Sequence, residues 1–164
     1  MSENPKQRLI IISGSPCVGK TTVATALFES YENGAYCDGD WVWCVNPFSM
    51  DDPRLRCGDK NMSFVISTYL NARFDTVILS TVVAMYPSIR EPLLRDITAT
   101  DYTTIGFTLT CSEKTLVERH HKRGDHNGVS FEWLRMEPYA GDYVIETDDK
   151  TVTQIVNEIR AIIG

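Results

Sequence analysis

Short apolar runs alternate along the chain with segments in which apolar residues recur at helical spacing. Three runs rich in β-branched residues, at 9–12, 76–79 and 103–109, predict strands that are buried on both faces. Shorter stretches at 35–37 and 143–145 predict two more strands. Strands separated by helices are typical of βαβ units, which form a mainly parallel sheet with helices on both faces.

The segments between these strands carry helical signals. Ser112 can cap a helix that runs to about residue 123. Two further helix starts have the spacing of a capping box, Ser88 with Glu91 and Thr151 with Gln154. The predicted helices, apart from the one that follows Thr151, cover 20–30, 61–71, a segment from about 87, 112–123 and 130–139.

The residues after the first strand have the pattern of a phosphate-binding loop. They read Gly14-Ser-Pro-Cys-Val-Gly19-Lys20-Thr21, which fits G-x-x-x-x-G-K-[ST]. The glycines let successive N–H groups point into one concavity, and the following helix N-terminus adds a partial positive charge. Lys20 is predicted to reach the phosphates of ATP, and the Thr21 hydroxyl to bind Mg²⁺. The predicted nucleotide-binding residues are Gly14, Ser15, Pro16, Cys17, Val18, Gly19, Lys20, Thr21 and Thr22.

Two carboxylates follow the second predicted strand, in the sequence Asp38-Gly39-Asp40-Trp41. Ligands bind beyond the carboxyl ends of parallel strands, so this turn is expected beside the phosphate loop. Asp38 is a candidate for holding the metal, and Asp40 for accepting the proton of a substrate hydroxyl. The alternative is an ordinary Asp-Gly turn without a chemical role.

Other classes of P-loop protein lack support in the sequence. Motor ATPases and many GTPases end a second strand with a metal-binding Asp, whereas the strand at 76–79 ends in Ser80-Thr81. The base-reading pattern Asn-Lys-x-Asp of GTPases is absent from the sequence. A switch GTPase is therefore disfavoured.

On these residues the chain resembles the small P-loop kinases, which include nucleoside monophosphate, shikimate, gluconate and adenylylsulfate kinases and chloramphenicol phosphotransferase. The order of elements is similar from about residue 8 to 164. The resemblance implies a three-layer α/β P-loop NTPase fold with a five-stranded parallel sheet in the order 2-3-1-4-5. It also implies phosphoryl transfer from ATP, with Mg²⁺, to a hydroxyl or phosphate of a small molecule. Ser80-Thr-Val-Val83 stands where shikimate kinases have a triple glycine, so shikimate is not implied.

Two arginines precede a polar loop at 124–128. Arg119 and Arg123 are four residues apart, so they share one helix face. The resemblance implies a small lid around 119–130 within one domain, 1–164, whose arginines neutralise charge during transfer. The alternative is a solvated basic helix end, which the helix dipole favours.

The acceptor site is less defined. Trp41 could stack on a ring of the acceptor, and Arg54, Arg56 or Arg90 could clamp an acidic group. Core packing of the tryptophan and solvated arginines are the alternatives. The predicted substrate-binding residues are Asp38, Asp40, Trp41, Arg54 and Arg90, and the sequence does not identify the acceptor.

Composition limits the partners. The net charge of -6 argues against a nucleic-acid surface, and no apolar run reaches the length of a membrane span. Five cysteines without a C-x-x-C pair are typical of reduced thiols, and a cytoplasmic protein is predicted. A nucleotide-binding regulatory module with little catalysis and a 5′-hydroxyl polynucleotide kinase are the alternatives to a small-molecule kinase.

Overall fold

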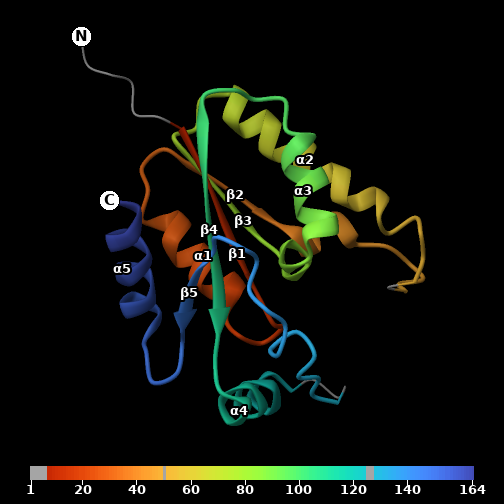
Figure 1. Ribbon diagram of the computed structural model, residues 1–164, viewed down its shortest axis with the longest axis vertical. Coiled ribbons are helices and arrows are strands. Elements are labelled where there is room, and N and C mark those ends of the chain that lie inside the picture. Colours follow the sequence, from red (N-terminus) through yellow and green to blue (C-terminus); the bar gives the residue numbers. More distant parts are fainter. Residues whose placement is uncertain (1–6, 50, 125–127) are drawn as a thin grey trace.

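The computed structural model describes residues 7–49, 51–124 and 128–164. Five parallel strands form one sheet in the order β2-β3-β1-β4-β5, which confirms the expected order (Figure 1). The strands are β1 (Gln7–Gly14), β2 (Gly34–Asp38), β3 (Thr76–Ser80), β4 (Tyr102–Thr110) and β5 (Tyr143–Glu146).

Helices cover both faces of this sheet. Figure 1 shows α2 and α3 on one face, α1 and α5 on the other, and α4 beyond the carboxyl end of β4. Two short 3₁₀ helices follow β2 and β3. The helices are α1 (Lys20–Glu29), η1 (Gly39–Trp43), α2 (Cys57–Asn71), η2 (Val82–Met85), α3 (Pro87–Arg95), α4 (Glu113–Arg123) and α5 (Val152–Ile163).

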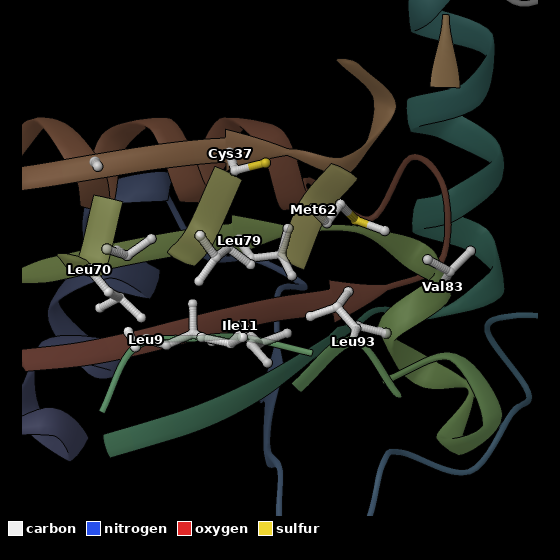
Figure 2. Packing of buried hydrophobic residues seen from close by; sticks show 14 of the residues in the cluster. Leu9, Ile11, Cys37, Met62, Leu70, Leu79, Val83 and Leu93 are labelled. Atoms are coloured by element: carbon white, nitrogen blue, oxygen red, sulfur yellow. The ribbon is translucent and has the colours of Figure 1, made fainter. Parts of the chain in front are cut away.

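The central strand β1 divides the core into two layers. Because successive side chains of a strand point to opposite faces, Leu9 and Ile11 pack with the α2 and α3 layer (Figure 2). Ile10 and Ile12 pack with the α1 and α5 layer. All four side chains are fully buried, and burying each contributes about 1.5–3 kcal/mol. This two-sided burial explains the unbroken apolar run in the sequence.

Two of the predicted helix caps are confirmed and one is wrong. The Ser112 side chain accepts from the Thr115 N–H, and Thr151 and Gln154 form the predicted capping box. The box at Ser88 does not form, because α3 begins at Pro87 with Tyr86 at its N-cap. Proline suits the first turn, where its missing N–H needs no partner.

The helix predicted over 130–139 is wrong. Residues 128–142 run through turns and irregular backbone to β5. Pro138 disfavours helical backbone at the residue before it. The segment is instead anchored by separate side-chain contacts: the Trp133 indole N–H donates to the Tyr86 hydroxyl at 2.8 Å, and Arg135 pairs with Glu113.

The organisation into a single domain with a small lid stays a prediction. Residues 125–127 of the predicted lid and its polar loop lie outside the described residues. None of the helices in the described ranges combines the length and apolar character that crossing a bilayer requires.

Candidate active site

The phosphate loop connects β1 to α1 through a tightly curled backbone. Three of its residues have a positive φ: Gly14 at 138°, Cys17 at 65° and Gly19 at 105°. A Cβ at Gly14 would overlap the carbonyl oxygen of Leu109 in β4, so only glycine fits between the two strands there. Gly19 is the N-cap of α1, which directs the first N–H groups of the helix toward the loop.

The Lys20 side chain extends back to the phosphate loop. Its ammonium donates to the Ser15 carbonyl at 2.9 Å. Burial lowers the pKa of Lys20 from 10.5 to about 8, although the neighbouring carboxylates Asp40 and Asp38 oppose the shift. Both carboxylates therefore lie close enough to Lys20 to act on its charge.

Asp38 is held by three donors at the end of β2. One carboxylate oxygen accepts from the Thr21 hydroxyl at 3.1 Å and from the Tyr36 hydroxyl at 2.9 Å, and the other accepts from the Asp40 N–H at 3.0 Å. The Tyr36 oxygen also lies 2.7 Å from the Ser80 hydroxyl, which must donate because the Tyr36 proton is already engaged. The Asp38 side chain is therefore buried in a fixed orientation beside Thr21.

Arg119 ties α4 to the phosphate loop. Its guanidinium donates to the Val18 carbonyl at 2.8 Å and to the hydroxyl and carbonyl of Thr147, at 2.9 and 3.1 Å. Arg123, one turn later, lies with one nitrogen 3.8 Å from the Cys17 sulfur. Both arginines thus reach the loop, and Arg119 also fixes the chain after β5.

These residues surround a cavity of about 660 Å³ at the carboxyl edge of the sheet. The cavity has two walls, because β2 and β3 lie on one side of β1 and its phosphate loop, and β4 and β5 lie on the other. We call the first wall the acidic half: Asp38, Asp40, Trp41, Ser80, Thr81 and Val82. We call the second wall the basic half: Arg119, Arg123, Lys150, Val152 and Ile155.

The three arginines predicted as possible acceptor clamps, Arg54, Arg56 and Arg90, do not line this cavity. Arg54 is highly exposed and pairs with Asp52 at 2.7 Å. Arg90, on α3, is buried beside Gly106 of β4, where it pairs with Asp142 through bonds of 2.8 and 2.9 Å and lies over the Tyr139 ring at 3.9 Å. The other predicted residues, apart from Gly14 and Ser15, line the cavity, including Trp41, which is 63% exposed.

Sequence reasoning missed several residues of the site. Tyr36 lies two positions before Asp38, so both side chains point to the same face of β2. The alternation of side chains along the predicted strand could have indicated this. Ser80 and Thr81 were passed over because no carboxylate ends β3. Lys150, just before α5, also lines the cavity, although its ammonium pairs with Glu158 at 2.6 Å.

The donor set at Thr21 and Asp38 fits Mg²⁺. Within the described residues, no group of three or more His, Cys, Asp or Glu side chains converges as a metal site would require. Mg²⁺, however, is usually held by one or two protein oxygens and completed by phosphates and water. A buried carboxylate beside a hydroxyl, both at the phosphate loop, is consistent with this mode of Mg²⁺ binding.

Comparison with solved structures finds the same fold in several P-loop proteins. A tunicamycin resistance protein from Deinococcus radiodurans matches with a TM-score of 0.72 and 18% identity, covering 97% of this chain and 96% of its own. An APS kinase from Mycobacterium tuberculosis, bound to AMPPNP and APS, matches with a TM-score of 0.68 and 16% identity, covering 98% and 99%. A gluconokinase from Sinorhizobium meliloti has a TM-score of 0.63 and 20% identity, covering 97% and 92%.

At these identities the likeness shows the fold. It agrees with the resemblance to small P-loop kinases that the sequence motifs indicated. Comparison with curated proteins finds no match. A model of the family described as an AAA domain matches residues 10–140, most of the chain, and its range includes both the phosphate loop and the arginines of α4. The chain therefore belongs to this AAA domain family.

Proposed function

We propose that the protein is a kinase that transfers the terminal phosphoryl group of ATP to a small molecule, with Mg²⁺. The observation that carries this proposal is the meeting of Lys20, Thr21, Asp38 and Asp40 at one end of a single cavity. A protein that only bound phosphates would need the loop and Lys20. The acidic pair beside them adds what a transfer reaction requires.

The two halves of the cavity suit the two substrates. ATP would place its phosphates on the loop amides and Lys20, and its base against Val152 and Ile155 in the basic half. Arg119 and Arg123 would stabilise the charge of the transferred group. The acidic half would then receive the acceptor.

Thr21 and Asp38 would hold the metal. Mg²⁺, when bound, neutralises charge on the phosphate oxygens. Thr21 donates its hydroxyl hydrogen to an Asp38 carboxylate oxygen, which leaves the lone pairs of the Thr21 oxygen available to bind the metal. Tyr36 donates to the same carboxylate oxygen.

Asp40 would act as the general base when the acceptor is an alcohol. Its side chain is exposed to the cavity, whereas that of Asp38 is buried and already engaged. Asp40 would take the hydroxyl proton as the alcohol oxygen bonds to the γ-phosphorus, and the bond from that phosphorus to the β-phosphate oxygen would break to release ADP.

The direct test is the Lys20→Ala variant in an ADP-release assay with ATP, Mg²⁺ and a panel of acceptors. We expect turnover to fall by about 10²-fold or more, because the ammonium opposite the transferred group is lost. Lys60→Ala, an exposed change on α2, is the matched control and should behave like wild type. Wild-type turnover in Lys20→Ala would refute the proposal. ATP binding without acceptor-dependent turnover would instead favour a regulatory nucleotide-binding module.

A further inference from the structure

The acidic half of the cavity has a definite chemical character. The Asp40 carboxylate and the Trp41 ring are both exposed there, and the Trp41 ring meets Tyr36 edge-on at 5.4 Å. Thr81 adds a buried hydroxyl that has no hydrogen-bond partner among the described residues. A molecule bound against this wall meets negative charge, an aromatic face and hydroxyl groups.

The arginines that could have reversed this charge are engaged elsewhere. Arg54 is paired with Asp52 at 2.7 Å and points into solvent. Arg56 lies over the Trp43 ring at 4.9 Å and 3.6 Å from Asp59. Each guanidinium is therefore matched by a carboxylate of the chain itself.

Arg90 is neutralised most completely. Its side chain is 4% exposed, and both terminal nitrogens bond to the Asp142 carboxylate, which is 1% exposed. The pair lies above Gly106 in β4, where a Cβ would overlap the Asp142 carboxylate. Releasing Arg90 to bind an anion would leave Asp142 buried without a cation, at a large cost in stability.

On the basis of the kinase function proposed above, we propose that the phosphoryl acceptor is an alcohol with no charge or a positive charge, and that it lays a ring or other apolar face on Trp41. A carboxylate or phosphate on the acceptor would be repelled by Asp40 and would find no unengaged arginine among those three. An ammonium group would be attracted both by the carboxylates and by the Trp41 ring. The reaction consumes ATP and the alcohol and yields ADP, the phosphate ester and one proton, which Asp40 receives.

The test uses acceptors that share a ring and differ in charge. One series is glucosamine, glucose and glucuronate, and a second is tyramine, tyrosol and 4-hydroxyphenylacetate. Acceptor-dependent ADP release is measured for each with Mg·ATP. We expect the cationic or neutral member of a series to exceed the anionic member by about tenfold or more in kcat/KM, because like charges placed together are strongly disfavoured.

Two outcomes overturn the inference. One is that an anionic member is the best acceptor of its series. The other is that no cationic or neutral member stimulates ADP release while the protein binds ATP normally. Loss of ATP binding itself would refute the kinase proposal instead, so the two failures are distinguishable by calorimetry with Mg·AMPPNP.

Two variants sharpen the result. Trp41→Ala should raise the KM for the preferred acceptor by about tenfold and leave the KM for ATP unchanged, because the ring is lost only from the acceptor's wall. Arg56→Gln should leave the preferred acceptor's kinetics unchanged. Two nitrogens of Arg56 are buried and have no hydrogen-bond partner within residues 7–49, 51–124 and 128–164, so this variant reveals whether they turn toward a substrate. An anionic acceptor whose turnover depends on Arg56 would overturn the inference.

Discussion

The two halves of the cavity begin from the same architecture and differ in charge. Both lie beyond the carboxyl ends of two parallel strands, on either side of β1 in the sheet. The half beside β2 and β3 presents Asp38 and Asp40, whereas the half beside β4 and β5 presents Arg119 and Arg123, with Lys150 paired to Glu158 at 2.6 Å. The fold itself does not set this polarity, because strand ends in a parallel sheet are equivalent.

The difference assigns a task to each half. A triphosphate carries several negative charges and is accommodated by cations, whereas an alcohol that must lose a proton needs a carboxylate nearby. Lys20 lies between the two, bonded to the loop and acted on by Asp40. Changes on the acidic side should therefore affect the acceptor step, and changes on the basic side should affect nucleotide binding.

The largest difference between the effect on the acceptor step and the effect on ATP binding is expected for Asp40→Asn. The amide keeps the size of the side chain and cannot take a proton, so acceptor-dependent turnover should fall by roughly 10²–10⁴-fold. The ATP dissociation constant, measured by calorimetry, should change little. Equal losses in turnover and ATP affinity would break the division of tasks between the halves.

Arg119→Ala, unlike Asp40→Asn, should weaken ATP binding as well as turnover. It removes three charge-assisted bonds to Val18 and Thr147, and bonds of this type are worth about 1.5–3 kcal/mol each in favourable cases. We expect ATP affinity to weaken by roughly 10–100-fold, because the cavity loses a cation and Val18 in the phosphate loop loses the side chain that holds it. Lys114→Ala, a highly exposed change on the same helix, is the control and should bind ATP like wild type.

Tyr36→Phe tests the hydrogen bonding that holds Asp38 in the acidic half. The change removes one hydroxyl that holds Asp38 and keeps the ring that contacts Trp41. The Mg²⁺ concentration needed for half-maximal turnover should rise by about two- to tenfold, in line with one hydrogen bond of roughly 0.5–1.5 kcal/mol. Turnover at saturating Mg²⁺ should be close to wild type. A fall in maximal turnover with no change in Mg²⁺ dependence would contradict a positioning role.

The smallest effect concerns the proton on Lys20. Its pKa of about 8 means that the ammonium loses its proton as pH rises through that value. Bound phosphates favour the charged form, so ATP binding at pH 8 should take up roughly half a proton, and less at lower pH. Calorimetry in two buffers of different ionisation enthalpy measures this uptake. Lys20→Arg keeps its charge at every pH and should abolish it, so equal uptake in both proteins would place the titrating group elsewhere.

Much of the fold could be read from the sequence because burial on both faces of a strand leaves an unbroken apolar run. Leu9 to Ile12 is such a run, and all five strands were predicted near their observed positions. The segment after Gly128 was misread as a helix. Its path depends on contacts such as that of Trp133 with Tyr86, 47 positions away, which no local pattern contains.

The candidate site, too, was predictable only in part. The phosphate loop is a local pattern, so its residues were predictable. The setting of Arg90 was not, because a basic residue on a helix normally lies in solvent and its partner Asp142 is 52 positions away. Which arginines reach the cavity is decided by such distant pairings, and so it becomes visible only in three dimensions.

The ion pair between Arg90 and Asp142 has a consequence for how the fold can vary. It fixes the backbone one residue before β5 begins at Tyr143. Insertions or deletions between 128 and 141 would therefore alter the course of that segment and leave the pairing of β5 with β4 in register. The length and path of this stretch can therefore change without altering the sheet.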